Sequence, residues 1–511
     1  MIKTFASAVQ GIDATTITIE TDVSQGIRFF LVGLPDNAVK ESQQRIESAL
    51  RLNDLKWPRK KIIINMAPAD LRKEGSAYDL PLAIAVLAAS EQVSSREIGK
   101  YVLMGELSLD GTLQPIRGAL SIAVNARKEG FEGLILPVQN AREAAVVDKL
   151  KVYGAETLRE VVDFFNGVPG LSQTVVDTRN EFYRKLEYSE VDFADVKGQE
   201  NVKRALEIAA AGGHNLIMIG PPGAGKTMLA KRIPTILPPF TLSEALETTK
   251  IHSVAGKTGR NTSLMTERPF RSPHHTISDV ALVGGGTYPQ PGEISLAHNG
   301  VLFLDELPEF KRTVLEVMRQ PLEDRKITIS RARFSVEYPA SLMLVASMNP
   351  CPCGYYNHPT KECVCGPGVV AKYLNKISGP LLDRIDIHLE VVPVPFRKLS
   401  EMSAAETSRT IRERVLKARK IQSERYKTKP GIFCNAQMTT KLVRTFVVLD
   451  QTSISLLRNA MEKLGLSARA YDRILRVSRT IADLEGAAKV EPHHISEAIQ
   501  YRSLDRESWG E

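Results

Sequence analysis

Long hydrophobic runs are missing from this sequence. The longest apolar stretch, Leu80 to Ala89, covers about ten residues, whereas a helix needs roughly 20 to cross a bilayer. The first residues, Met1 to Ala6, also lack the apolar stretch of a signal peptide. Cysteine is scarce, with 5 in 511 residues, and most of these are clustered, which is not the pattern of a secreted disulfide scaffold. We therefore expect a cytoplasmic protein that has no membrane partner.

The composition is that of an ordinary globular protein, with 43% hydrophobic and 25% charged residues. A chain of 511 residues is long enough for two to four domains with sizeable cores. The formal net charge of +8 favours a polyanionic partner. A merely basic surface is an equally good interpretation of that charge.

A phosphate-binding loop organises the chain. It follows an apolar run at 216–219 and leads into a helical pattern at 228–233, which is the strand, glycine turn and helix of a P-loop. Glycines let backbone N–H groups approach phosphate oxygens, and the helix N-terminus adds partial positive charge. The residues expected to bind ATP are Gly220, Pro221, Pro222, Gly223, Ala224, Gly225, Lys226, Thr227 and Met228. Lys226 would reach the β- and γ-phosphates, and Thr227 would hold Mg²⁺.

Two further apolar runs end in polar residues that suit ATP hydrolysis. Residues 301–304 precede Asp305 and Glu306; we expect Asp305 to hold Mg²⁺ and Glu306 to polarise the attacking water. The alternative is that both carboxylates cap the next helix. A third run, 341–348, ends in Asn349, whose amide could orient that water or contact the γ-phosphate, the role called sensor 1.

Two arginines are candidates for contacts with the transferred phosphate. Arg384 is the candidate arginine finger, which ring ATPases supply from a neighbouring subunit; alternatively it pairs locally with Asp383 or Asp386. Arg469 follows Ser467, a candidate helix N-cap, and is placed as a sensor 2 arginine. The alternative for Arg469 is an ordinary surface arginine.

A basic hairpin is predicted between the two carboxylates and Asn349. Residues 324–337 alternate in polarity, with Ile327 and Ile329 on one face. Arg325, Lys326, Arg331 and Arg333 around its tip suit contacts with phosphates, and the family resemblance given below implies that these phosphates belong to DNA. A solvated edge strand blunted by charge is the alternative.

Four cysteines follow Asn349 directly: Cys351, Cys353, Cys363 and Cys365. Four thiolates can form a tetrahedral structural Zn²⁺ site, although one residue between paired ligands is fewer than usual, and His358 could replace one ligand. Free reduced thiols and a redox-active disulfide are the alternatives. Cys434 stands alone and is expected in the core.

The first 165 residues are expected to form an α/β domain, with strands at 15–20 and 61–65 and helices at 78–89 and 121–128. Residues 105–118, with the apolar segment 133–137 after them, resemble the proteolytic domain of Lon-type proteases, which cut with a Ser–Lys dyad. Residues 73–80 do not reproduce the nucleophile motif, and 114–127 contain no lysine to activate a serine. We expect an inactive scaffold or docking domain.

The sequence therefore predicts an α/β protein with four parts. A Lon-protease-like domain (1–165) and a linker (166–190) precede a core (191–398) of three αβα layers, and a helical lid (399–511) follows. The first residues of the core, 191–199, resemble the entry to an AAA+ module. The expected insertions in the core are a helix-2 insert at about 250–290, the hairpin at about 322–340 and the cysteine segment at 351–365.

Four sequence blocks, 268–278, 291–310, 348–354 and 377–386, resemble the YifB/ComM family of magnesium-chelatase-like AAA+ ATPases. The resemblance implies a homo-hexameric ring that hydrolyses ATP with Mg²⁺ and moves on single-stranded and branched DNA, promoting branch migration in natural transformation. Two other classes stay open: a chelatase-type motor for metal insertion, and an AAA+ ATPase that remodels proteins. The basic hairpin favours nucleic acid.

Overall fold

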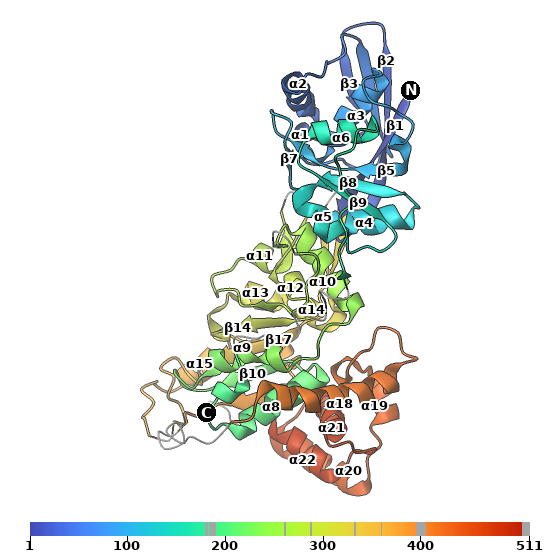
Figure 1. The fold of residues 1–511 in the computed structure, drawn as a ribbon. Coiled ribbons are helices and arrows are strands. Elements are labelled where there is room, and N and C mark those ends of the chain that lie inside the picture. The colour runs from blue at the N-terminus through green and yellow to red at the C-terminus, as the bar shows by residue number, and fades with distance from the viewer. Residues whose placement is uncertain are drawn as a thin grey trace. The chain divides into compact units, whose positions relative to one another are not determined.

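The computed structural model describes residues 1–178, 182, 191–259, 262–286, 289–331, 334–358, 360–394 and 405–502. The chain forms two compact units (Figure 1). The first combines Met1–Leu186 with Thr241–Thr266, and the second combines Glu187–Phe240 with Glu267–Glu511. Among the described residues, we find no helix with both the length and the apolar character needed to cross a membrane.

A mixed seven-stranded sheet forms the centre of the N-terminal unit, in the order β3-β4-β2-β1-β5-β8-β9. Its strands are β1 (Ile2–Gln10), β2 (Asp13–Ser24), β3 (Phe29–Val32), β4 (Lys61–Ala67), β5 (Tyr101–Leu103), β8 (Gly133–Pro137) and β9 (Lys151–Ala155). β1, β2 and β4 pair antiparallel, and the other pairs are parallel. β6 (Glu106–Leu107) and β7 (Leu113–Gln114) form a small hairpin of their own. The sequence predicted strands within β2 and β4, and the structure confirms both.

The helices of this unit pack where their apolar residues require it. α3 (Asp79–Ala89) is apolar on all sides and almost completely buried, in contact with β1 and β2. The other helices are α1 (Asn37–Lys40), α2 (Ser42–Leu52), α4 (Ala119–Lys128), α5 (Val138–Ala144) and α6 (Leu158–Phe165). Helices were predicted at the positions of α3 and α4, and both are confirmed.

Residues 241–266, which lie within the expected core 191–398, group with the N-terminal unit in the structure. α10 (Leu242–Val254) packs on α4. The N–H of Gly118 donates to the carbonyl of Ser253 at 3.2 Å, and the Thr258 hydroxyl donates to Glu143 at 3.3 Å. The expected insert at 250–290 is thus divided between the two units, a division that local sequence patterns do not reveal because it depends on long-range packing.

A five-stranded parallel sheet forms the centre of the second unit, in the order β11-β14-β17-β10-β18. Its strands are β10 (Leu216–Ile219), β11 (Phe270–Arg271), β14 (Val301–Leu304), β17 (Met343–Met348) and β18 (Ile387–Glu390). The strands β10, β14 and β17 are buried along their whole length, which explains their uninterrupted apolar sequences. The helices of this core are α8 (Glu200–Gly212), α9 (Lys226–Ile236), α11 (Asp279–Val283), α12 (Glu293–Leu296), α13 (Arg312–Val317), α14 (Arg319–Asp324), α15 (Val369–Leu374) and α16 (Gly379–Leu382).

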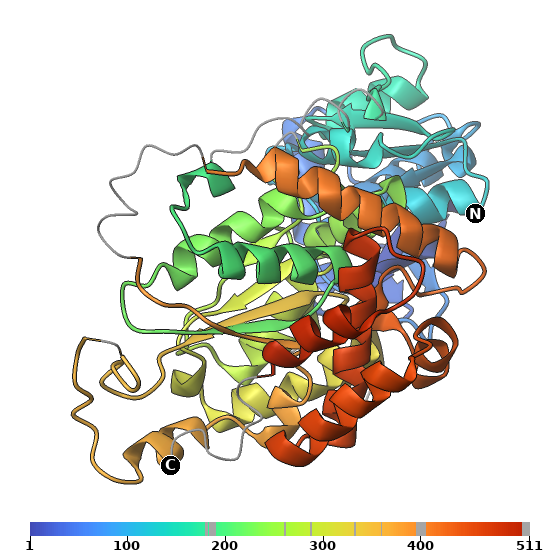
Figure 2. The ribbon, with the colours of Figure 1, turned by 90° about the horizontal axis from the view of Figure 1, so that it is seen from below.

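The C-terminal region is helical, as expected, and shares one hydrophobic core with the parallel sheet. Its helices are α18 (Ser408–Tyr426), α19 (Thr440–Phe446), α20 (Gln451–Leu464), α21 (Ala468–Leu484) and α22 (Pro492–Gln500). α18 contacts both α8 and α9, and Figure 2 shows it beside these green helices. The predicted α/β fold class with a helical lid is confirmed.

Candidate nucleotide site

The phosphate-binding loop has the predicted strand–turn–helix form. β10 ends at Ile219, the turn follows, and α9 begins at Lys226. Gly223 and Gly225 adopt φ values of 79° and 86°, a left-handed conformation that favours glycine. The loop therefore requires glycine at both positions, and it leads directly into the N-terminus of α9, where partial positive charge favours phosphate.

Lys226 lies across this loop. Its Nζ donates to the carbonyls of Gly220 at 2.6 Å and Pro221 at 3.0 Å, and to Oδ1 of Asn349 at 3.1 Å. Burial lowers the pKa of Lys226, against the opposing charges of Asp305 and Glu306. An ammonium held in this way can exchange carbonyl partners for phosphate oxygens. The contact with Asn349 brings the sensor 1 residue to the P-loop, as β10 and β17 are neighbours.

Asp305 connects three elements at one edge of the sheet. Its Oδ2 accepts a hydrogen bond from the Thr227 hydroxyl at 2.7 Å, and its Oδ1 accepts from the Ser347 hydroxyl and from the N–H of Glu306. Carboxylate and hydroxyl oxygens are the ligands that Mg²⁺ prefers. The pair Thr227 and Asp305 therefore fits Mg²⁺, which would neutralise phosphate charge. Ser347 was not among the sequence candidates.

Glu306 has an unusual backbone. Its φ of 54° and ψ of 49° place a non-glycine residue in the left-handed region, where strain is often connected with function. Its carboxylate is 57% exposed and lies 3.5 Å from Nδ1 of His275. The ring of His275 lies 4.1 Å from that of His274. Sequence reasoning singled out the segment 268–278 but gave neither histidine a role; the adjacent histidine pair was the available signal.

Arg384 is buried, with 8% of its surface exposed, after α16. Its Nη1 donates to the carbonyl of Pro380 at 2.6 Å, and its Nη2 pairs with Glu323 at the end of α14. That pairing lowers the pKa of Glu323. The alternative prediction, that Arg384 pairs with Asp383 or Asp386, is wrong. Arg384 pairs with Glu323, and the two aspartates pair with arginines of α21.

Arg469 lies in the first turn of α21, behind the N-cap Ser467, whose hydroxyl accepts from the N–H of Ala470. Nη1 of Arg469 is 3.2 Å from Oδ2 of Asp383. One turn further along α21, Nη1 of Arg473 is 3.0 Å from Oδ1 of Asp386. The helix that carries the sensor 2 candidate therefore holds the chain on both sides of Arg384.

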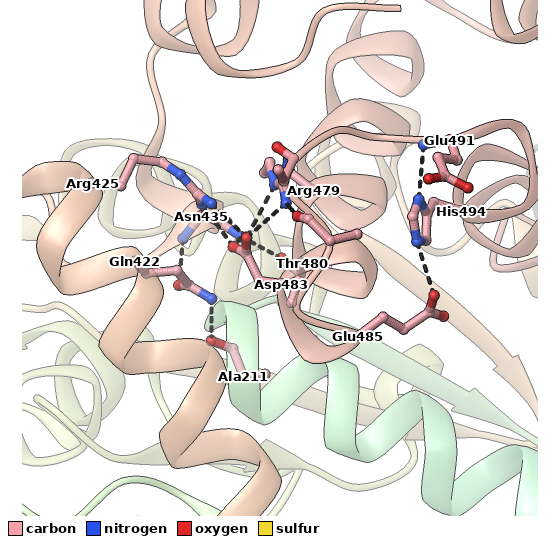
Figure 3. Close-up of polar contacts among 12 residues, drawn as sticks. Ala211, Gln422, Arg425, Asn435, Arg479, Thr480, Asp483, Glu485, Glu491 and His494 are labelled. Carbon is pink, nitrogen blue, oxygen red and sulfur yellow. Dashed lines mark hydrogen bonds and ion pairs between the residues drawn. The ribbon is translucent and has the colours of Figure 1, made fainter.

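A buried polar network fixes α21 to its neighbours. Oδ2 of Asp386 and Oγ1 of Thr480 lie 3.0 and 2.8 Å from the two ring nitrogens of His214. Figure 3 shows the continuation of this network, in which Asp483 accepts hydrogen bonds from Arg425, Arg479 and Asn435. The network connects the loop before β10 with the lid helices. These hydrogen bonds join α21 to His214, which lies two residues before the P-loop strand β10.

The hairpin has the predicted strands, β15 (Lys326–Arg331) and β16 (Phe334–Pro339), with Ile327 and Ile329 buried. Arg325 and Lys326, however, stand at its base and not around its tip. Arg325 ends α14 with a φ of 56°, and burial lowers the pKa of its guanidinium. Lys326 pairs with Glu337 across the strands at 2.8 Å. The alternating pattern did not show where the helix ends.

The tip of the hairpin therefore carries fewer of the DNA-binding candidates than expected. Arg331 is the last residue of β15 and pairs with Phe334 in the ladder. Arg333 lies outside the described residues. Arg331 and Arg333 remain the candidates for phosphate contacts.

The four clustered cysteines meet as the sequence suggested. Sγ of Cys351 lies 3.3 Å from that of Cys353 and 3.7 Å from that of Cys363, and the latter two are 3.6 Å apart. With Cys365, all four sulfurs lie within 4.8 Å of one another. A tetrahedral Zn²⁺ with Zn–S bonds of about 2.3 Å has S···S edges of about 3.8 Å, so the donor set is compatible with zinc. Cys434 is buried alone, as expected.

In the N-terminal unit, the serine and lysine of 73–80 are not paired with each other. The Ser76 hydroxyl donates to Glu106, and Nζ of Lys73, which is buried, donates to the carbonyl of Pro68. Burial also lowers the pKa of Lys73. That this domain is proteolytically inactive stays a prediction.

Comparisons with known proteins agree with the fold. Residues 192–399 match the family described as "Magnesium chelatase, subunit ChlI", residues 19–140 match "Subunit ChlI of Mg-chelatase", and residues 405–502 match "Magnesium chelatase, subunit ChlI C-terminal". The P-loop, the Asp305 carboxylate and the parallel sheet thus define a magnesium-chelatase-like AAA+ ATPase.

Sequence similarity to known proteins identifies the family within this class. The chain is 45% identical to "Competence protein ComM" of Haemophilus influenzae over 98% of this chain and 97% of the relative. It is 44% identical to the protein YifB of Escherichia coli over 98% of this chain and 96% of the relative. The chain belongs to the YifB/ComM family. It is also 33% identical to "Lon protease 2" of Bacillus subtilis over 28% of this chain and 27% of that protein, which confirms the Lon-like part of the predicted fold.

Proposed function

We propose that this protein is an ATP-driven DNA motor that works as a homo-hexameric ring in the cytoplasm. Its substrates would be single-stranded and branched DNA, and its task would be branch migration during recombination in natural transformation. The observation that carries the ATPase part is the meeting of Lys226, Thr227, Asp305 and Asn349 at one sheet edge. The name of the relative "Competence protein ComM" supports the pathway.

The chain's own residues divide the work of hydrolysis. Lys226 and the loop amides bind the phosphates, and Thr227 and Asp305 would hold Mg²⁺, which would supply charge neutralisation. Glu306 polarises the attacking water, with Asn349 orienting it. Arg384 would act on the nucleotide of the neighbouring subunit, and Arg469 on the nucleotide through lid movement. Positioning and charge neutralisation account for nearly all catalysis in such phosphoryl transfer.

The cysteine cluster would add one structural Zn²⁺ per chain. The distances between the sulfur atoms support this proposal, because they are close to the S···S distances of a tetrahedral zinc site. They are also longer than the roughly 2.05 Å of a disulfide bond. Elemental analysis of protein purified without added metal is expected to give about one zinc per chain. The cofactors of the proposed motor are thus ATP, Mg²⁺ and structural zinc.

The deciding experiment compares ATP hydrolysis with and without single-stranded DNA, and follows branch migration on a three-stranded junction. We expect DNA to stimulate hydrolysis and junctions to move only with ATP, while Lys226→Ala protein does neither. A chelatase motor or a protein-remodelling ATPase would hydrolyse ATP without responding to DNA, and that result would contradict the proposal.

A further inference from the structure

The segment that carries Cys351, Cys353, Cys363 and Cys365, here called the cysteine turn, lies against the phosphate-binding loop within the same compact unit. A Cβ built on Gly354, the residue after Cys353, would lie 2.5 Å from Cδ of Pro222 in the P-loop. Gly354 has a φ of 85°, and its N–H donates to the carbonyl of Cys351 at 3.0 Å. The turn thus presents bare backbone to Pro222, because no side chain fits between them.

Two further contacts join the same segments. The N–H of Gly220, the first residue of the P-loop, donates to the carbonyl of Met348 at 3.2 Å. Lys226 donates to the next residue, Asn349. Since only Pro350 separates Asn349 from Cys351, the P-loop touches this segment before and within the cysteine turn.

Regular secondary structure and burial contribute little to the stability of the cysteine turn. Residues 349–368 contain no helix or strand among those the structure describes. Cys351 is fully buried and its Sγ accepts the N–H of Tyr356 at 3.3 Å, whereas Cys353, Cys363 and Cys365 are only partly buried. A segment without regular structure or a core of its own needs another constraint to hold a fixed shape, and four metal–thiolate bonds supply one.

We propose that the zinc-bound cysteine turn is a positioning element for ATP hydrolysis. It holds Pro222 and Asn349 in the geometry that binds phosphate and orients water. This inference rests on the proposed ATPase and on zinc in the turn, but it does not depend on DNA. It assigns to residues 350–365 a task in the nucleotide site, to which they contribute no catalytic group.

The central test is Gly354→Ala, which puts a methyl group against Pro222 and leaves all four sulfurs in place. Its matched control is Gly368→Ala, because Gly368 has a similar φ of 74° but a Cβ there would meet nothing within 4 Å. Zinc content, ATP affinity and basal hydrolysis are measured for both. We expect Gly354→Ala to keep its zinc and to lose about tenfold in kcat/KM for ATP, and Gly368→Ala to match wild type. A zinc-replete Gly354→Ala protein with wild-type hydrolysis would overturn the proposal.

A second route removes the metal. Cys363→Ser should lose zinc and most of its basal hydrolysis, whereas Cys434→Ser removes a buried thiol outside the cluster and should keep both. Should a variant fail to fold, zinc is withdrawn from wild-type protein with a chelator and then restored, and hydrolysis should fall and recover with it. Zinc-free protein that hydrolyses ATP at the wild-type rate refutes the positioning role. Absence of DNA stimulation in wild type refutes only the DNA motor.

Discussion

Arg469 of the lid lies 3.2 Å from Asp383, the residue immediately before the candidate arginine finger Arg384. Arg473 holds Asp386 on the other side at 3.0 Å. Any movement of α21 that follows nucleotide binding therefore acts on the chain that carries Arg384. In the proposed ring, this arrangement would give a physical route from the nucleotide in one subunit to an arginine finger that serves its neighbour.

The Arg469–Asp383 pair predicts opposite effects of two substitutions on ATP affinity. Asp383→Asn frees the guanidinium for the nucleotide, and because an exposed pair contributes up to about 1 kcal/mol, affinity should rise by up to about fivefold. Arg469→Ala should lower it. Glu413→Gln, which breaks the exposed pair with Arg409 on α18, is the control and should change nothing. Titration with a fluorescent ATP analogue measures the ATP affinity of all three variants. If Asp383→Asn and Arg469→Ala changed the affinity in the same direction, Arg469 would not exchange Asp383 for the nucleotide.

Glu306→Gln is expected to separate binding from hydrolysis. The amide keeps the size of the side chain but cannot polarise water, so ATP should still bind while kcat falls by about 10²-fold or more. The control is Glu309→Gln, which changes a carboxylate three residues on that pairs with Lys376 and should keep its activity. If Glu306→Gln turned over at the wild-type rate, another group would have to activate the water. Lys226→Ala should lose binding itself.

Arg384 is predicted to act between subunits. Neither Arg384→Ala nor Lys226→Ala protein should hydrolyse ATP alone, but a mixed ring contains some interfaces with both groups intact. Mixing the two inactive proteins should therefore restore part of the activity. Mass spectrometry must show that mixed rings form. Mixed rings without any recovered hydrolysis would be inconsistent with a finger supplied from a neighbouring subunit.

Sequence patterns identified the residues of the candidate nucleotide site, which lie together in the structure, because each of its parts is local. The loop 220–227 and the pair Asp305–Glu306 are contiguous motifs next to buried strands, and parallel strands bring their carboxyl ends to one edge. The partners Glu323 of Arg384 and His275 of Glu306 could not be predicted in this way. Each comes from a separate loop or helix end, and its position depends on packing between elements.

His388 predicts a loss of stability in mild acid. It lies buried in β18, and burial, with the charge of Arg502, lowers its pKa well below the usual value. Below about pH 6.5, His388 is protonated in the unfolded chain but stays neutral in the folded chain. The free energy of unfolding therefore falls as pH falls. This group contributes a slope of at most about 1.4 kcal/mol per pH unit. Urea unfolding between pH 7.5 and pH 5 should show a shallower slope for His388→Gln; identical slopes would refute this role.

The hairpin tip decides whether the motor acts on DNA. Ile327 and Ile329 of β15 are buried, and Arg331 is the last residue of that strand. A ring that threads its substrate would present these tips to the phosphates, so binding should depend little on sequence and weaken steeply with salt. Replacing Arg331 and Arg333 together by Ala should lower DNA affinity and remove DNA stimulation. Basal ATP hydrolysis should persist, because neither side chain belongs to the nucleotide site.

The salt dependence makes this test quantitative. Each lost phosphate contact lowers the slope of log K against log salt by about 0.7 for single-stranded DNA, so the double variant should lose roughly 1.4 in slope. Lys326→Ala is the internal control: this lysine stands at the base of the hairpin and already pairs with Glu337, so its loss should leave the slope almost unchanged. Fluorescence anisotropy at several salt concentrations measures both. A double variant that keeps the wild-type slope and moves junctions normally would leave the hairpin as a solvated edge and place the DNA contacts elsewhere.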